Sequence, residues 1–207
     1  MMRRRPISSS LLATGLAALG TVAACGDPVL DQQIASFGPE KPDVPRGEFH
    51  RAGQACVACH QDGGPAGSKP FSVAGTVFAQ PGSNVGIGGV TVAMTDAVGS
   101  VYTVKTNCVG NFFVPRSAWD PSFPILARVW KETIPATQTM RGAIFRERSC
   151  NKCHANPPNV TPQQLARTTD PRLTLAGVIY LVQSSQPAPA PDANCPVDPA
   201  LKTGTMP

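Results

Sequence analysis

Short apolar stretches recur between residues 71 and 145, and glycine, proline, asparagine and aspartate separate them. One stretch alternates cleanly, because Val90, Val92 and Met94 fall on one side of an extended chain and the residues between them on the other. A period of two is typical of a strand that buries one face in a sandwich and exposes the other to water. The pattern predicts six strands, over Val73–Phe78, Val90–Thr95, Val101–Lys105, Asn111–Val114, Phe123–Trp130 and Met140–Phe145.

These strands imply a mainly β protein with one small domain over residues 71–147. Turn-forming residues join them, and nine of the chain's twelve aromatic side chains lie between residues 71 and 145. Short antiparallel strands joined in this way favour a Greek-key sandwich, with loop-rich flanks and disordered termini around it. A further apolar run, Leu173–Val182, is expected to add a strand or short helix that covers either the sandwich edge or the second of the two cysteine motifs described below.

The first 24 residues have the composition of an export signal. Three arginines precede an apolar run over residues 7–22 that carries no charge. That run is shorter than the ~20 residues that a membrane-spanning helix needs, so we expect a cleaved signal peptide over residues 1–24. Without those arginines the remaining chain has 15 basic and 13 acidic residues. This near-neutral balance, with no basic cluster, argues against nucleic acid as a partner.

The signal ends in Val22-Ala23-Ala24-Cys25, which resembles the lipobox of bacterial lipoproteins. The resemblance implies that Cys25 carries the lipid and anchors the protein to a membrane of the bacterial cell envelope. A plain exported product is the alternative, because an ordinary signal peptidase also accepts small residues here. Residues 25–48 are then expected to form an extended, poorly packed tether, and the proline-rich tail over residues 187–207 no fold of its own.

Two pentapeptides carry the chemistry of this chain. Cys56-Val57-Ala58-Cys59-His60 lies in a segment over residues 49–70, and Cys150-Asn151-Lys152-Cys153-His154 in one over residues 148–186. Both are C-x-x-C-H, the attachment signature of c-type haem, in which two thiols form thioethers and the adjacent histidine ligates iron. Here the chain resembles multihaem cytochromes c. The resemblance implies two covalent haems c, with His60 and His154 as proximal ligands, and a redox partner protein in the envelope.

The motif cysteines are also compatible with two kinds of chemistry that use no haem. In an oxidising compartment each C-x-x-C pair could close as a local disulfide, which leaves both histidines without a role. Four thiolates, or a mixture of cysteine and histidine, could instead surround one zinc ion. That arrangement requires the two motifs to meet in space.

The axial ligands opposite the two histidines are scarce in this chain. His50 is the only histidine outside the motifs, and we take it as a candidate sixth ligand; Met140 is a weaker candidate, because it also suits a buried strand. If neither serves, one iron has an open face, and only then is a peroxidase-like activity expected. Otherwise the protein is an electron carrier with no catalytic residues. Asp96 and Asp120 are interpreted as solvated turn residues.

Cys108 and Cys195 remain once the motifs and Cys25 are assigned. They make an even pair in an exported protein, so a disulfide between them is predicted, with two unrelated thiols as the alternative.

The strand-forming region also resembles the carboxypeptidase-regulatory-like or transthyretin-like domains. The matching stretches are Val73–Phe78, Gly88–Val92, Thr106-Asn107 and Gly110–Phe112. The resemblance implies a small exported scaffold without catalytic residues. Together the motifs favour a lipid-anchored dihaem cytochrome that carries electrons in the bacterial cell envelope, facing the periplasm or the cell surface. The alternative is a structural or ligand-binding envelope lipoprotein whose motif cysteines form disulfides or a zinc site.

Overall fold

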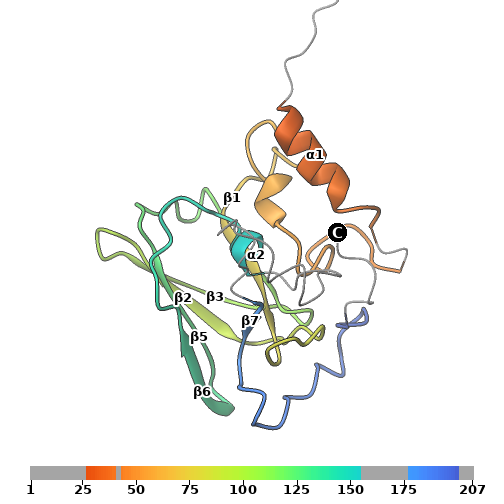
Figure 1. Ribbon diagram of the computed structural model, residues 1–207, viewed down its shortest axis with the longest axis vertical. Helices are drawn as coiled ribbons and strands as arrows, with labels where there is room; N and C mark the ends of the chain where they lie inside the picture. Colours follow the sequence, from red (N-terminus) through yellow and green to blue (C-terminus); the bar gives the residue numbers. More distant parts are fainter. Residues whose placement is uncertain (1–26, 41–42, 155–176, 201–207) are drawn as a thin grey trace, which may run out of the picture.

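A computed structural model of the chain describes residues 27–40, 43–154 and 177–200, and its fold is mainly β (Figure 1). The signal peptide and Cys25 lie outside the described residues. Two sheets form a small sandwich. The first has the order β4-β1-β7 and the second β3-β2-β5-β6. The strands are β1 (Phe71–Phe78), β2 (Thr91–Thr95), β3 (Val101–Lys105), β4 (Asn111–Pro115), β5 (Leu126–Lys131), β6 (Ile134–Thr139) and β7 (Ile179–Tyr180).

The core lies between the two sheets, as the alternating pattern predicts. Val73 and Val77 of β1 and Val92 and Met94 of β2 are all at most 2% exposed and belong to one apolar cluster. Because a strand sends alternate side chains to opposite faces, this spacing buries one face of each sheet against the other. The predicted mainly β sandwich is therefore confirmed.

The last two strands differ from the prediction. The strand expected over Met140–Phe145 lies instead at β6, which pairs with β5 across a short turn. Pro135 argues against a strand in the sequence, because proline has no N–H to donate to a neighbouring strand. Strand β6 tolerates it because β6 is at the sheet edge, where that N–H would have no strand partner. Strand β7 lies within the run Leu173–Val182, where a strand or a short helix was expected, and it differs from the antiparallel strands expected for the sandwich because it runs parallel to β1.

Residues 28–36 are not the extended, poorly packed tether that the prolines suggested. They form helix α1 (Pro28–Ser36), whose first turn is capped by Asp27 accepting hydrogen bonds from the N–H groups of Val29 and Leu30 at 3.0 and 3.1 Å. Proline suits this first helical position because its missing N–H would have no partner there. The helix packs its apolar side chains against the first C-x-x-C-H segment.

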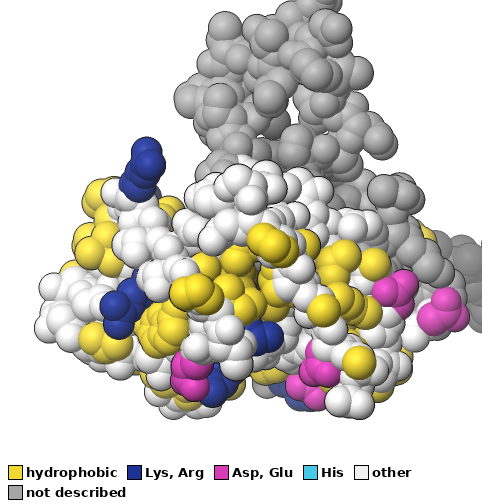
Figure 2. All heavy atoms as spheres, turned by 90° about the horizontal axis from the view of Figure 1, so that it is seen from below, with side chains coloured by type: hydrophobic (Ala, Val, Ile, Leu, Met, Phe, Trp, Pro, Cys, Tyr) yellow, Lys and Arg dark blue, Asp and Glu magenta, His cyan; other side chains and the backbone are white. Residues whose placement is uncertain are grey.

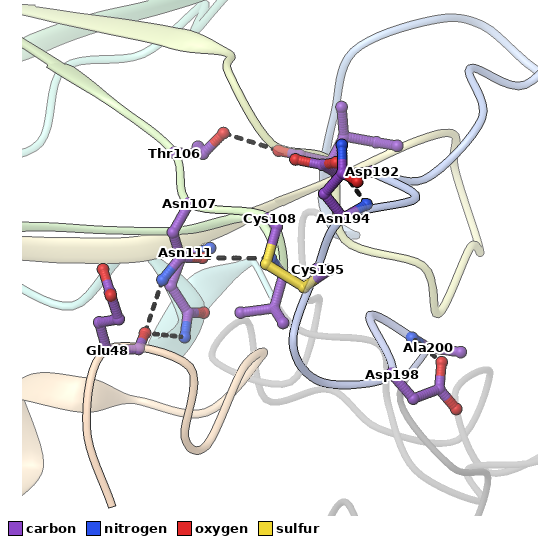
Figure 3. The surroundings of a disulfide bond; sticks show 12 residues. Glu48, Thr106, Asn107, Cys108, Asn111, Asp192, Asn194, Cys195, Asp198 and Ala200 are labelled. Atoms are coloured by element: carbon purple, nitrogen blue, oxygen red, sulfur yellow. Dashed lines mark hydrogen bonds between the residues drawn. A yellow bond between two sulfur atoms is a disulfide. The ribbon is translucent and has the colours of Figure 1, made fainter. Parts of the chain in front are cut away.

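A disulfide joins Cys108, in the turn before β4, to Cys195 in the tail (Figure 3). The pairing is the one that the cysteine count predicts, and the Cα atoms are 5.5 Å apart. The bonded cysteines pack beside Val178, Val109 and Phe78 in a second apolar cluster. The disulfide therefore fastens the tail to the sandwich.

Asp96 is a turn residue, but it is buried rather than solvated. Its carboxylate accepts hydrogen bonds from the N–H groups of Val98, Ser100 and Ser122, so its role is to order the turn between β2 and β3. Asp120 is half exposed and pairs with Arg148 at 2.7 Å. Neither aspartate faces the cavity described below.

The surface of the sandwich is mixed in character. On the face drawn in Figure 2, apolar side chains gather near the middle, and lysine, arginine and acidic side chains are scattered around them. None of the helices among the described residues has the length and apolar character required to cross a membrane.

Candidate functional site

Both C-x-x-C-H motifs fold into the same local structure, a single helical turn. The first forms the 3-10 helix η1 (Cys56–Ala58) and the second the short helix α2 (Cys150–Cys153). In each, the backbone N–H of the histidine donates to the carbonyl of the first cysteine, at 3.0 Å for His60 and 2.8 Å for His154. Residues three and four apart are neighbours on such a turn, so the turn places the two cysteines and the histidine of each motif next to one another along the backbone.

The two motif histidines also share a hydrogen-bonding state. The ring Nδ1 of His60 is 2.9 Å from the carbonyl oxygen of Lys69, and that of His154 is 2.9 Å from the carbonyl of Gly177. A carbonyl only accepts, so Nδ1 carries the proton and donates it in both rings. When such a ring is neutral, its lone pair is on Nε2, which is the state in which histidine ligates a metal.

A cavity of about 980 Å³ opens beside the first motif. This volume is at the upper end of the roughly 300–1,000 Å³ typical of cofactor sites. Helix α1 and the loop after it form one side, and strands β1 and β4 form another. The apolar walls and the motif side chains that border it include Ile34, Phe37, Ala55, Cys56, Cys59, His60, Pro70, Phe71 and Phe113.

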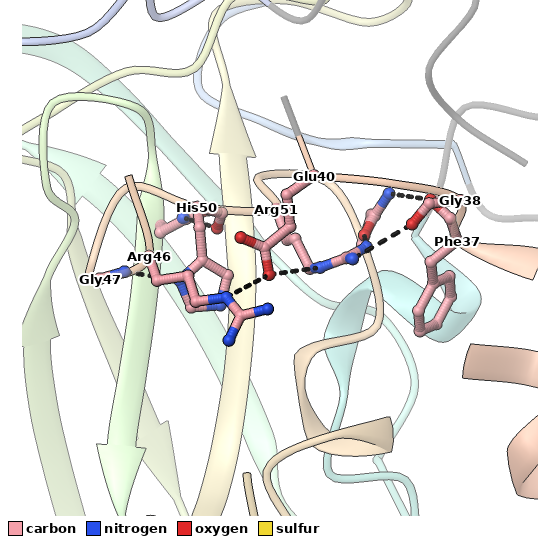
Figure 4. Close-up of polar contacts among 9 residues, drawn as sticks. Phe37, Gly38, Glu40, Arg46, Gly47, His50 and Arg51 are labelled. Carbon is pink, nitrogen blue, oxygen red and sulfur yellow. Dashed lines mark hydrogen bonds and ion pairs between the residues drawn. The ribbon is translucent and has the colours of Figure 1, made fainter. Parts of the chain in front are cut away.

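Charged side chains line the same cavity. Glu40 lies between Arg46 and Arg51, with N–O distances of 3.6 and 3.5 Å, and Arg51 also bonds to the carbonyl of Gly38 (Figure 4). Lys69 is a third cation of the lining. The site combines apolar walls, two thiols, several cations and a histidine whose Nε2 can ligate a metal. This combination fits a flat apolar cofactor that carries carboxylates, as haem does.

His60 is held in place by stacked rings. Phe71 lies parallel to it, with centroids 4.0 Å apart and planes at 11°, and Phe113 stacks on Phe71 in turn at 5.0 Å. Burial lowers the pKa of His60, against the opposing effect of the Lys69 carbonyl. The neutral ring required for ligation is therefore favoured.

The structure brings His50, the predicted sixth ligand, to the same cavity. Its ring centroid is 6.0 Å from that of His60, with planes at 24°. However, its Nδ1 accepts a hydrogen bond from the N–H of Gly47 at 3.0 Å, so the neutral ring carries its proton on Nε2. His50 can ligate only by giving up this bond. Met140 follows β6 and is not among the residues that line this cavity.

The second motif lies beside β1 on the side away from β4, next to the short stretch of that side that pairs with β7. The N–H of Ala74 donates to the carbonyl of Arg148 at 3.0 Å, and the N–H of Thr76 donates to the Oδ1 of Asn151 at 2.8 Å. The 3-10 helix η1 of the first motif packs against the same strand. The two motifs, about ninety residues apart in sequence, thus pack against the same strand, β1 (Figure 1).

Gly75 makes this docking possible. A Cβ atom at this position would lie 2.8 Å from the Cβ of Cys150 and 2.8 Å from the ring of Phe112. We expect Gly75→Ala to lower the free energy of unfolding by about 1–3 kcal/mol in a urea titration, because overpacking displaces one of these neighbours. Gly142→Ala is the control, since no atom lies within 4 Å of its added Cβ. Equal stability of the two variants would contradict the close approach of α2 to β1.

All four motif cysteines are free thiols in this structure. Burial raises the pKa of Cys56 to about 11. Burial, and then the nearby Cys56 thiol, raise the pKa of Cys150 to about 12. The first cysteines of the two motifs are therefore close enough to interact electrostatically. Within the described part of the chain, no three or more histidine, cysteine or acidic side chains are gathered as a metal-binding group.

These pKa values predict the order in which the thiols of the haem-free protein react. At pH 8 we expect exposed Cys153 to be alkylated by iodoacetamide at least about tenfold faster than Cys56 and Cys150, because the thiolate is the reacting form. Rates at the two slow thiols should rise about tenfold per pH unit between pH 7 and 9. Pulse alkylation followed by peptide mass spectrometry measures this. Similar rates at all three cysteines would contradict the raised pKa values of the partly buried Cys56 and Cys150.

Several residues of the site carry no sequence signal of their role. Lys69 contributes a backbone carbonyl, Phe71 a ring face, and Asn151 an amide that pairs with a distant strand. Of these three, only Asn151 could have drawn attention in the sequence, because it lies between the two cysteines of the second motif. Comparisons of the chain with protein-family models, with curated proteins and with solved structures found no match.

Proposed function

We propose that this protein is an exported dihaem c-type cytochrome, anchored through a lipid on Cys25, that carries electrons in the bacterial cell envelope. The observation that carries the proposal is the shared state of the motif histidines. His60 and His154 each follow a one-turn C-x-x-C segment and each donate Nδ1–H to a backbone carbonyl at 2.9 Å. Two sites with the same arrangement are better accounted for by one cofactor chemistry than by separate disulfides, which would make no use of the rings.

At the first site, Cys56 and Cys59 would hold the haem through thioether bonds and His60 would ligate its iron. When bound, haem supplies a one-electron Fe(III)/Fe(II) couple. Phe71 and the Lys69 carbonyl fix the plane and the proton of the His60 ring. The apolar walls would contact the haem ring, and the three lining cations could pair with the haem carboxylates. Arg46 and Arg51 would then exchange Glu40 for a propionate, since a carboxylate already occupies this position.

At the second site, Cys150, Cys153 and His154 would play the same parts. Gly177 supplies the carbonyl that orients His154. A partner for these sites is a redox protein of the envelope, and the lipid anchor would keep the carrier at the membrane.

The test is an intact mass and a reduced-minus-oxidised visible spectrum of the protein expressed with the haem-attachment machinery. Two covalent haems with a low-spin reduced spectrum are expected. A polypeptide mass without haem, with the motif cysteines oxidised or holding zinc, would overturn the proposal and favour the structural or binding lipoprotein.

The Gly47–His50 bond gives a second candidate a specific basis. If His50 keeps this bond, it does not ligate the iron of the first haem. That haem would then have an open face, where a peroxidase-like activity would be possible. A high-spin ferric spectrum at one haem, converted to a complex by cyanide, would favour this candidate. A low-spin spectrum at both haems would exclude it.

A further inference from the structure

A buried polar network crosses strand β1 between the two motifs. At its centre is Thr76, which is fully buried. Its Oγ1 accepts a hydrogen bond from the N–H of Gly53 at 2.8 Å and donates one to the Oδ1 of Asn111, also at 2.8 Å. Its backbone N–H donates to the Oδ1 of Asn151 at 2.8 Å. Thr76 therefore satisfies partners on three separate segments.

One end of this network is inside the second motif. Asn151 is the residue after Cys150, and it is 2% exposed. Among the described residues its amide oxygen has a hydrogen-bond partner, whereas its Nδ2 atom has none. The contact with Thr76 is therefore the polar contact that fixes this side chain, and with it the turn that carries Cys150 and Cys153.

The other end holds the loop in front of the first motif. Asn111 lies opposite Thr76 in the ladder between β1 and β4. Its Nδ2 donates to the carbonyl of Glu48 at 3.2 Å (Figure 3) and to that of His50, also at 3.2 Å. Gly53, three residues before Cys56, is held by Thr76 directly. The network thus reaches both the candidate axial ligand His50 and the backbone that leads into η1.

Because the network is buried, its members cannot exchange a lost partner for water. Removing the Thr76 hydroxyl takes a partner from the Gly53 N–H and from the Asn111 Oδ1, and leaves the Asn111 side chain held, within the described residues, only through its Nδ2 bonds to the carbonyls of Glu48 and His50. Valine has nearly the same shape as threonine, so Thr76→Val removes the two hydrogen bonds of the hydroxyl, keeps the backbone N–H bond to Asn151 and largely keeps the packing. Serine keeps the hydroxyl, and Thr76→Ser is the conservative rescue.

We propose that Thr76 is a positioning residue shared by the two haem sites, which couples the second motif to the loop that carries His50. The inference rests on the proposed function and deepens it. It assigns no contact between Thr76 and haem. Its consequence is that a change at Asn151, in the second motif, alters the axial environment of the first haem.

The first test uses the haem-free protein and hydrogen exchange at single amides. Thr76→Val is expected to speed exchange of the Gly53 amide at least about tenfold, and Thr76→Ser to leave it near the wild-type rate. Thr103→Val is the matched control, since Thr103 is exposed on β3 in the other sheet. Unchanged exchange in Thr76→Val would overturn the role of Thr76.

The second test uses the dihaem protein and a redox titration followed by electron paramagnetic resonance, which separates two ferric haems. Thr76→Val and Asn151→Leu are each expected to shift the midpoint potential and the g-values of the first haem, with less than additive effects in the double variant. Thr76→Ser and Thr103→Val should match the wild type. The first haem is assigned by its absence in a Cys56→Ala/Cys59→Ala variant.

The outcomes separate this inference from the proposed function. If haem attaches but Asn151→Leu changes only the second haem, the coupling is overturned and the dihaem cytochrome stands. If no haem attaches to the wild-type protein, the proposed function fails and the coupling of haem sites fails with it. A Gly53 exchange effect in that case still identifies Thr76 as the residue that holds the loop.

Discussion

Protein in which Cys56 and Cys59 are both replaced by alanine is expected to carry one covalent haem, where the wild type carries two. The thioether bonds need these two sulfurs, and His60 alone would have to hold haem by a single coordinate bond. Because the second motif has its own thiols and its own oriented histidine, its haem should be retained. Intact mass of the denatured protein counts the haems directly.

The matched variant is Cys150→Ala/Cys153→Ala, which should lose the other haem, and the quadruple variant should lose both. His60→Ala separates attachment from ligation, since its thiols remain and its iron loses the proximal nitrogen. It should keep haem mass but show an altered spectrum at one site. If the wild type and every variant had the mass of the polypeptide alone, with no haem, the assignment of both motifs would be overturned.

Replacing Cys108 and Cys195 together with alanine is expected to lower the free energy of unfolding by about 2–5 kcal/mol. The disulfide closes a loop with a sequence separation of 87 residues, so its loss releases a large chain entropy in the unfolded state. It also frees the tail that brings Val178 and β7 to the sandwich. A guanidinium titration of the two proteins gives the difference.

Two comparisons control this experiment. Reduction of the wild type should reproduce most of the loss without a change in sequence, and reoxidation should reverse it. The single variant Cys195→Ala should be close to the double variant, because either substitution opens the same loop. A double variant as stable as the wild type would show that the bond contributes nothing to the folded chain.

Some features of the fold were within reach of sequence reasoning. The places of β1 and β2 are predicted well, but the face of β2 expected in water is also buried at Thr91 and Ala93. Strand β6 and helix α1 were missed for opposite reasons. Pro135 masked a strand that the sheet edge tolerates, whereas the capping pair Asp27-Pro28 marked a helix start inside a stretch interpreted as a tether.

The candidate site divides in the same way. The spacing within C-x-x-C-H sets which atoms share one helical turn, since residues three and four apart are neighbours whatever surrounds them. The cavity does not follow from that spacing. Its walls come from α1, β1 and β4, and the tautomer of His60 is set by the carbonyl of Lys69, nine residues away. Such contacts depend on how the chain closes on itself.

By itself, the sequence determined which ligand atoms each C-x-x-C-H motif offers. It also determined that two cysteines, Cys108 and Cys195, are left to pair with each other, and that the two-residue alternation of apolar positions favours a mainly β protein. These are local properties, fixed by covalent spacing and by side-chain alternation. Only the tertiary structure decided that both motifs lie on β1, with Thr76 between them, and that His50 faces the cavity of the first motif. Sequence patterns do not encode these positions, because they arise when segments far apart in the chain bury their polar groups against one another.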